Sequence, residues 1–210
     1  MTDARSDTID FTMMYVTHDA LRRDLGRLTA AAAAGTARSP TVRAGWENFK
    51  AQLHLHHTVE DDDLWPRLYR AVADRPDAIA LLREMEAEHA VLDPLLAAVD
   101  DALSDRPNQP LAPRLDALAA ALDAHLTHEE NRALPLIQSA LTLQDWRGFA
   151  KAMARAQGIK GAAVYVPWIL DGASAAERRR FFAALPRPVR VINRLLWEPR
   201  YRHRGLWAVS

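Results

Sequence analysis

The chain has 210 residues, of which 49% are hydrophobic and 26% charged, so it is long enough to bury a core as one globular domain with or without an appendage. It contains no cysteine, which excludes disulfides, zinc ribbons, iron–sulfur clusters and cysteine nucleophiles. Basic and acidic residues balance at 27 each. The sequence shows neither a secretory signal nor an apolar run long enough to cross a bilayer, and we expect a cytoplasmic protein.

Four long stretches have apolar residues at helical spacing. They cover about residues 8–34, 39–73, 78–103 and 111–141. Gly35 is a suitable C-cap for the first stretch, Ser39-Pro40 opens the second, and residues 105–110 form a polar loop before the fourth. Because long helices joined by short loops pack against their neighbours in opposite directions, we predict an all-α fold with an antiparallel up-down four-helix bundle.

The rest of the chain is predicted to form additional C-terminal helices. Thr142 caps a helix that reaches about residue 156, and residues 158–161 break its pattern. Ser174 begins a capping box for another helix, and a short helix at 188–197 precedes an aromatic, basic tail. We therefore divide the chain into a bundle, residues 1–143, and a tryptophan-rich helical extension, residues 144–210.

Charge is distributed unevenly between the bundle and the extension. Residues 1–144 carry 14 basic and 23 acidic side chains, whereas residues 145–210 carry 13 and 4. We expect the basic extension to fold back onto the acidic bundle and to limit access to its interior. Two alternatives stay open, a weak contact with an anionic membrane surface and a homodimer contact. We expect no nucleic-acid partner and no transmembrane segment.

An internal repeat places histidine and glutamate at matching positions in the two predicted helical hairpins. The pattern His, three residues, Glu, five residues, Pro occurs at 56–66 and again at 125–135. A lone histidine precedes each pattern, His18 by 38 residues and His89 by 36. The prolines of the pattern, together with Pro94, predict kinks or breaks in the helices.

Residues four apart on a helix share a face, so each His-x-x-x-Glu pair projects as a unit. On the second helix that face also carries Trp46, Phe49 and Leu53, which directs the pair into the core. Burying carboxylates and imidazoles costs several kcal/mol unless they share a partner, and metal cations are the natural one. Imidazole together with carboxylate favours iron or manganese, and the duplicated pattern predicts a dinuclear site.

These motifs resemble those of the hemerythrin-like (HHE cation-binding) family, whose repeats carry a lone histidine and His-x-x-x-Glu in a four-helix bundle. The resemblance covers about residues 8–142. It implies two non-haem iron ions with oxo or hydroxo and carboxylate bridges, both glutamates bridging. The ligands carried over by motif are His18, His56, Glu60, His89, His125 and Glu129.

One position departs from the oxygen-carrying members of that family. They have a further histidine one turn before the third-helix ligand, where this chain has Met85. We expect an open position on one iron and a protein that binds or reacts with oxygen, peroxide or nitric oxide, in oxidative or nitrosative stress or redox chemistry. The alternatives are an iron-binding or oxygen-sensing protein without turnover and a diiron oxidase of a small organic substrate. No catalytic group is predicted beyond the metal site.

Four further residues are considered as additional ligands or as partners of the ligands. They are Tyr15, His57, Glu86 and His128. His57 and Asp61 are a rival to the pair at 56 and 60, which the alignment of the prolines favours. Glu86 could replace the missing nitrogen ligand, and Tyr15 could be a phenolate ligand or a core tyrosine. His128 is expected at the boundary of the site.

Three other expectations concern the surroundings of the motifs. Met14 and Met85 are expected to line the pocket. His54 points away from the apolar face of its helix and is expected in solvent. Asp61 and its two following aspartates are expected to form a solvated face.

Overall fold

The computed structural model describes residues 8–104 and 110–208, and over these residues it contains helices and no strand. The predicted loop at 105–110 therefore lies outside the described residues, apart from Pro110. Within the same ranges, no helix is both long and apolar enough to pass through a membrane.

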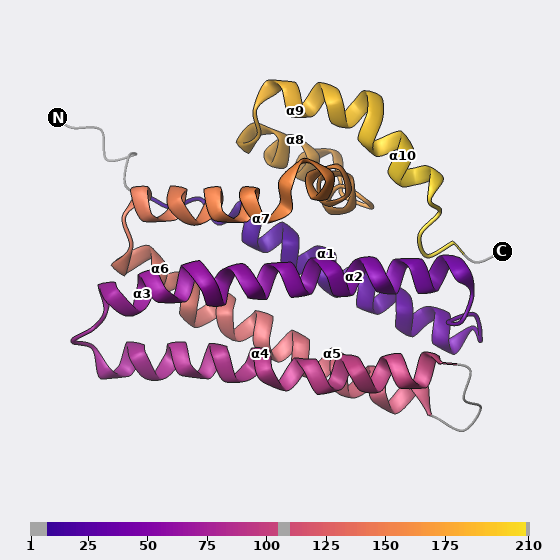
Figure 1. Ribbon diagram of the computed structural model, residues 1–210, viewed down its shortest axis with the longest axis horizontal. Helices are drawn as coiled ribbons and strands as arrows, with labels where there is room; N and C mark the ends of the chain where they lie inside the picture. The colour runs from indigo at the N-terminus through magenta and orange to yellow at the C-terminus, as the bar shows by residue number, and fades with distance from the viewer. Residues whose placement is uncertain (1–7, 105–109, 209–210) are drawn as a thin grey trace.

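Four long helical segments carry the His/Glu repeat, and successive segments run in opposite directions (Figure 1). Their limits lie within a few residues of the predicted ones. The segments are α1 (Thr12–Ala33); α2 (Pro40–Val59), η1 (Glu60–Leu64) and α3 (Trp65–Ala71); α4 (Pro76–Leu103); and α5 (Leu111–His128), η2 (Glu129–Ala133) and α6 (Leu134–Ala140).

The prolines at the end of each repeated pattern follow a π-helical turn. In η1 the N–H of Trp65 donates to the carbonyl of Glu60, and in η2 the N–H of Leu134 donates to the carbonyl of Glu129. A proline has no N–H and its ring crowds the carbonyl one turn earlier, so a wider turn before it lets the helix continue. The predicted breaks are therefore wide turns, and each begins at a glutamate of the repeat.

The apolar core is divided into two parts along the long axis. One part includes Leu21 and Leu53, and the other includes Met14 and Trp65. The histidines and glutamates of the repeat lie between these parts; His18, for example, lies between Met14 and Leu21 on α1. The repeat thus forms a polar layer with apolar packing on both sides.

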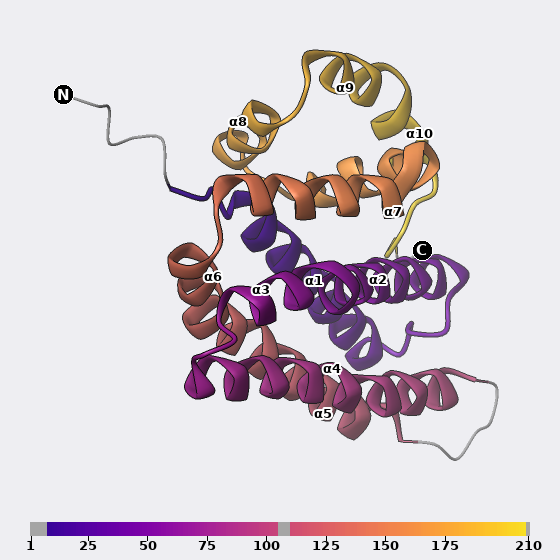
Figure 2. The same ribbon diagram turned by 60° about the vertical axis from the view of Figure 1, so that its left-hand side comes forward.

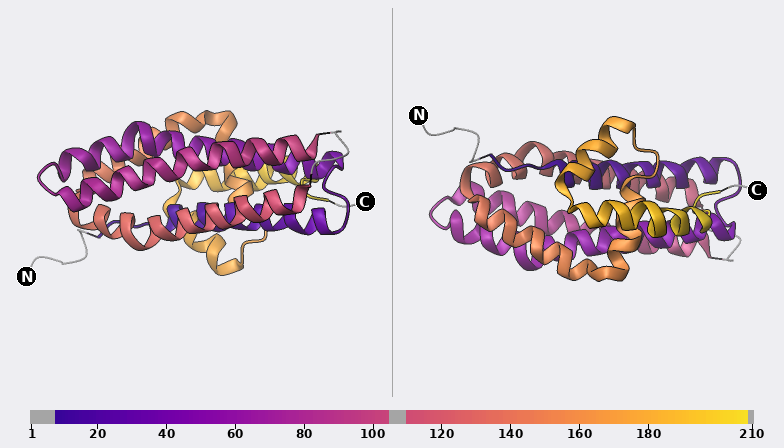
Figure 3. Two further views of the ribbon diagram at one scale, coloured as in Figure 1. Left: turned by 90° about the horizontal axis from the view of Figure 1, so that it is seen from below. Right: turned by 90° about the horizontal axis from the view of Figure 1, so that it is seen from above.

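The C-terminal helices cover the side of α1 and α2 opposite α4 and α5, as Figures 1 and 2 show and as the view from above in Figure 3 supports. They are α7 (Leu143–Ile169), α8 (Ala175–Ala184), α9 (Arg187–Ile192), η3 (Asn193–Trp197) and α10 (Glu198–His203). The capping boxes at Thr142 and Ser174 are present as predicted. The predicted break after residue 156 is present at Gly158, whose dihedral angles are not helical, although helical residues resume after it. The predicted end of the last helix at residue 197 is wrong, because η3 is followed by α10.

A buried tryptophan attaches the extension to α1. Trp168 donates from Nε1 to Oδ2 of Asp24 at 2.7 Å, and both side chains are fully buried. Beside them Arg27 forms an ion pair with Asp171 at 2.6 Å. The charges at this contact are the reverse of those expected, since the base lies on α1 and the acid on the extension.

The end of the chain is seated on the first turns of α2. Trp207 has a φ of 66°, and its N–H donates to the carbonyl of Thr41 at 3.1 Å. Its indole lies against Gly45, where an added Cβ would lie 2.4 Å from the ring. The close approach depends on the absence of a side chain at residue 45.

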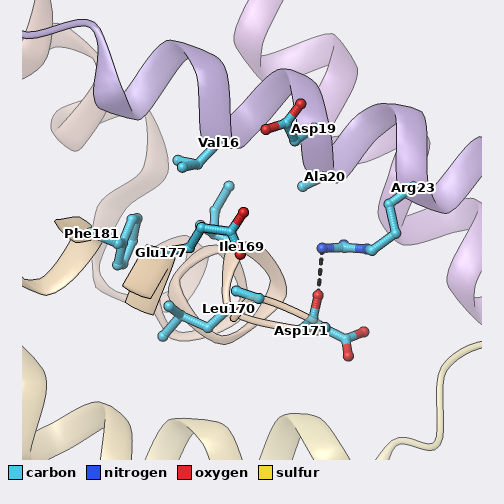
Figure 4. A pocket seen from close by; sticks show the side chains of 11 residues that line it. Val16, Asp19, Ala20, Arg23, Ile169, Leu170, Asp171, Glu177 and Phe181 are labelled. Carbon is cyan, nitrogen blue, oxygen red and sulfur yellow. Dashed lines mark hydrogen bonds between the residues drawn. The ribbon is translucent and has the colours of Figure 1, made fainter. Parts of the chain in front are cut away.

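A cavity of about 120 Å³ lies between α1 and the extension (Figure 4). Arg23 spans one side of it and donates to the carbonyl of Asp171 at 2.8 Å. Its apolar wall comes from Val16, Ile169 and Phe181. None of the six predicted metal ligands lines this cavity.

Candidate metal centre

Side chains from all four long segments form two neighbouring groups of potential ligand atoms. In each group these atoms all lie within 4.8 Å of one another, and every side chain is buried. We call them the Glu129 cluster and the His57 cluster. The first consists of His18, His56 and Glu129, and the second of His57, His89 and His125.

The distances inside both clusters suit a shared cation. The Nε2 atoms of His18 and His56 are 3.2 Å apart, as are those of His89 and His125. Oε2 of Glu129 lies 3.1 Å from Nε2 of His18. Nitrogen ligands at about 2.0–2.1 Å from one ion lie roughly 3 Å from each other, so the side chains already have the spacing of a ligand set.

Glu60 lies between the two clusters and reaches both. Its Oε1 is 3.2 Å from Nε2 of His56 in the Glu129 cluster, and its Oε2 is 3.7 Å from Nε2 of His89 in the His57 cluster. The carboxylate is fully buried. One carboxylate that spans two groups of imidazoles has the arrangement of a bridge.

Several polar atoms of the site have no hydrogen-bond partner among the residues that the structure describes. They are both carboxylate oxygens of Glu60 and of Glu129, Nδ1 of His56 and Nε2 of His57. Buried polar atoms are normally hydrogen-bonded, so such a concentration calls for an explanation. Cations between the two clusters would satisfy the carboxylates and the His57 nitrogen, and these residues therefore fit a pair of metal ions.

Carboxylates outside the clusters hold three of the histidines. Nδ1 of His18 lies 2.8 Å from Glu130, Nδ1 of His89 lies 2.9 Å from Asp61, and Nδ1 of His125 lies 2.9 Å from Glu88. When Nδ1–H donates to a carboxylate, Nε2 is left as the ligand atom and the ring is fixed in orientation. In each case that Nε2 faces its cluster.

Comparison with protein families agrees with this geometry. The family model of the hemerythrin HHE cation-binding domain matches residues 10–137. The chain belongs to this family. Comparison with curated proteins and with solved structures gives no significant match. The hemerythrin domain contains all seven residues described above as clusters and bridge, and the match ends before α7.

Two of the outer carboxylates follow the internal symmetry of the hemerythrin domain. Asp61 comes directly after Glu60 and bonds the lone histidine of the second hairpin, whereas Glu130 comes directly after Glu129 and bonds that of the first. The expectation that Asp61 only forms a solvated face is therefore wrong. The alignment of the two motifs contained the signal, since both glutamates are followed by another acidic residue.

The side chain of His57 points into the interior of the hemerythrin domain, beside His89 and His125. Its ring is buried and stacks on His89, with centroids 3.9 Å apart and planes 10° from parallel. Asp61, its predicted partner, bonds His89 instead. His56 and His57 are therefore not alternatives to each other, because each faces a different cluster.

Two of the other residues considered lie outside the clusters. Tyr15 is largely exposed, and Glu86 is exposed and accepts a hydrogen bond from Tyr69 at 3.1 Å, so neither acts as a ligand here. His128 lies 2.8 Å from Glu88, the carboxylate that also holds His125. The two methionines, Met14 and Met85, are buried in one apolar part of the core, and His54 is exposed as expected.

The charges of the site are strongly coupled without a cation. Burial, reinforced by the charge of Glu129, raises the pKa of Glu60 well above its usual value. Burial alone would lower the pKa of His18, but Glu129 and Glu130 raise it to about 9. His18 in turn lowers the pKa of Glu129 to about 2 despite burial, whereas burial lowers that of His56 to about 3. At neutral pH the metal-free site therefore holds a proton on His18, and the raised pKa of Glu60 opposes a second negative charge beside Glu129.

Proposed function

We propose that this hemerythrin domain is a non-haem diiron protein, built as an antiparallel up-down four-helix bundle, that acts on oxygen, peroxide or nitric oxide. The observation that carries the proposal is the position of Glu60, whose two oxygens reach both clusters. When bound, the iron pair would supply binding or redox chemistry towards these small molecules. A cytoplasmic location and a role in oxidative or nitrosative stress or redox chemistry belong to the same proposal.

The clusters supply a ligand set for each ion. We assign His18, His56 and Glu129 to the first ion and His57, His89 and His125 to the second, with Glu60 as a bridge. His57 then provides the nitrogen that the residue at the Met85 position does not. In this assignment each ion would have four ligands from the chain, three nitrogen atoms and Glu60 for the second and two nitrogen atoms, Glu129 and Glu60 for the first. Positions left open on the ions would be available to a small molecule.

Carboxylates outside the clusters orient the ligand histidines, and one of them connects the site to the protein surface. Asp61, Glu130 and Glu88 fix the Nδ1–H tautomer of the three histidines they bond. Glu88 also joins His125 to His128, whose side chain is partly exposed. This hydrogen-bonded chain gives the Nδ1 proton of His125 a route toward the surface.

The surroundings of the clusters favour small molecules over an organic substrate. The ligand side chains are buried, and the described cavities near the extension are lined by none of them. A diatomic molecule or peroxide needs far less space than an organic substrate does. Anaerobic reconstitution with iron, followed by stopped-flow absorption with oxygen, peroxide and nitric oxide, identifies which of the three reacts.

Metal content tests the dinuclear site directly. After iron-replete expression we expect two irons per chain by elemental analysis and an antiferromagnetically coupled pair by Mössbauer spectroscopy. His56→Ala and His125→Ala should each lose iron and lower the Tm, because buried carboxylates lose their compensation. His54→Ala, at an exposed position of the same helix as His56, is the matched control. One iron per chain in the unaltered protein, or full occupancy in both variants, would contradict the assignment.

A further inference from the structure

The outermost helix of the extension has an apolar face that no described residue covers. Four side chains on this face are 57%, 37%, 65% and 46% exposed; they are Val191, Ile192, Leu195 and Leu196, and we call them the α9–η3 face. They follow the spacing i, i+1, i+4 and i+5, which places them on one side of a helix. The opposite side carries the buried residues Asn193 and Tyr201, and η3 and α10 contact α7. The helix is thus attached along one side and apolar along the other.

Positive charge surrounds this face. Residues 178–208 contain nine arginines and a single acidic residue, Glu198. Glu198 is already paired with Arg178 at 2.8 Å and with Arg202 at 2.6 Å. Arg187, Arg190 and Arg194 lie on the same helix as the α9–η3 face and are exposed. The surface therefore combines exposed aliphatic side chains with uncompensated basic ones.

We propose that the α9–η3 face docks on the surface of an anionic phospholipid bilayer. Val191, Leu195 and their neighbours enter the boundary between headgroups and acyl chains, and the arginines contact lipid phosphates. An exposed apolar helix face flanked by basic residues binds membranes in this interfacial manner. Basic side chains near the bilayer add an attraction that salt screens.

Charge favours a bilayer over a second copy of the chain. A twofold contact through this face would place the same patch on both sides and bring the arginines against each other. Residues 76–128, which span α4 and α5, carry 10 acidic and three basic side chains. These two helices lie on the far side of α1 and α2 from α9 and α10 (Figures 1 and 2). An anionic surface would therefore attract the extension and repel the opposite side, which orients the protein.

Vesicle flotation of the full-length, iron-loaded protein tests the proposal. We expect binding to vesicles with about 30% phosphatidylglycerol to be at least ~tenfold tighter than to pure phosphatidylcholine, and to weaken in about 0.5 M NaCl. The double variant Leu195→Gln/Leu196→Gln should lose binding ~tenfold or more, and Arg190→Gln/Arg194→Gln should lose much of the salt dependence. Matched controls are Ile159→Gln and Val91→Gln, at side chains 83% and 54% exposed elsewhere on the protein. These controls should bind as the unaltered protein does.

A single label gives a second readout that does not depend on affinity. The chain has no cysteine, so Leu195→Cys or Ile159→Cys accepts one environment-sensitive fluorophore. We expect a blue shift on addition of anionic vesicles for the label at 195 and none at 159. Absence of binding at low salt, or equal loss in the control variants, overturns the proposal. So does a concentration-dependent dimer in sedimentation velocity that Leu195→Gln/Leu196→Gln abolishes, because the face would then belong to a second copy.

Discussion

At the scale of single residues, one ligand of the site holds a proton that a cation must displace. In the metal-free protein burial raises the pKa of Glu60 well above its usual value, and His18, with its pKa raised to about 9, is charged at neutral pH. Since metal ligands bind in their deprotonated forms, iron uptake at about pH 7.5 should release about one proton per chain from His18. Above about pH 9 this release should disappear.

Calorimetry in buffers of different ionisation enthalpy measures this release. His18→Ala removes the group that holds this proton and should lower the number of protons released by about one, with weaker binding. Iron uptake without a change in proton number would show that the metal-free site is ionised differently.

His57 provides a second test at this scale. The internal repeat places Leu126 at the matching position of the other hairpin, so His57→Leu is a substitution that the fold already accommodates once. We expect iron content to fall toward about one per chain while the helical signal is retained, since one ion loses a nitrogen ligand. Mössbauer spectra distinguish loss of one ion from partial loss of both.

Met85→His in the His57→Leu background completes this experiment. Met85 precedes His89 by one turn, so a histidine there should restore the nitrogen ligand and the iron content. If iron returns, His57 and residue 85 supply the same coordination position. If the single variant retains both irons with unchanged spectra, His57 is not a ligand.

The sequence predicts six residues of the site because the repeat identifies them, and it identifies His57 less well for a geometric reason. Adjacent residues on a helix point about 100° apart, so only one of His56 and His57 can face a given point. A site with two ions has two such points, and both histidines turn inward. The spacing of residues on one helix cannot show that His57 also faces the site, because this depends on where α4 places His89.

At the scale of helices, the π-helical turns connect proline to the position of the glutamates. Pro66→Ala should restore an N–H and allow η1 to become ordinary α-helix, which would rotate Glu60 relative to residues after it. We expect unchanged or higher stability of the metal-free protein and iron binding weakened several-fold. Chelator competition measures the affinity, and thermal melts measure the stability.

Pro94→Ala is the matched control for this prediction. Pro94 lies inside α4, five residues after His89, where the helix continues without a π-helical turn. It should therefore change stability without changing iron affinity. If both substitutions change iron affinity equally, the π-helical turns have no specific role in metal binding.

Helix limits were predictable where apolar periodicity and caps coincide, as at the capping boxes of Thr142 and Ser174. The break at Gly158, which takes a φ of 58°, was predictable from the glycine, but the helical residues that follow it were not. The continuation of the last helix past residue 197 was not predictable either. Pro199 lies beyond η3, which absorbs it in the same way as the wide turns before Pro66 and Pro135.

At the scale of the whole molecule, the ion pair between Arg27 and Asp171 makes attachment of the extension dependent on pH. Burial alone would raise the pKa of Asp171, but the hydrogen bond and charge of Arg27 hold it below its usual value. A lowered pKa stabilises the folded form above the usual value of about 4, and this contribution is lost as the pH falls through the lower, folded-state value.

Asp171→Asn should therefore lower stability by about 1 kcal/mol at neutral pH, a modest figure because both partners are partly exposed. The difference from the unaltered protein should shrink as the pH falls below about 4. Chemical denaturation at several pH values measures it. A difference that stays constant with pH would assign the effect to packing instead of charge.

Overall charge predicted the wrong sign for this contact. The excess of acid in residues 1–144 and of base in the extension suggested attraction between them, yet the paired groups are Arg27 and Asp171. Apolar burial around Trp168 determines where the extension packs on the bundle. The ion pairs that form are those between the charged side chains that this packing brings together. Net charge averages over a segment and contains no information about individual neighbours.

Because the indole of Trp207 packs against Gly45, we expect these two positions, which are far apart in the sequence, to covary among relatives. A methyl group at residue 45 would overlap the indole, so a side chain there requires Trp207 to move or to be replaced. Relatives with a large flat side chain at the end of the extension should therefore have a glycine at the position of Gly45. Those with any other residue there should have a shorter or differently placed tail, and the two positions should covary in an alignment although 162 residues separate them.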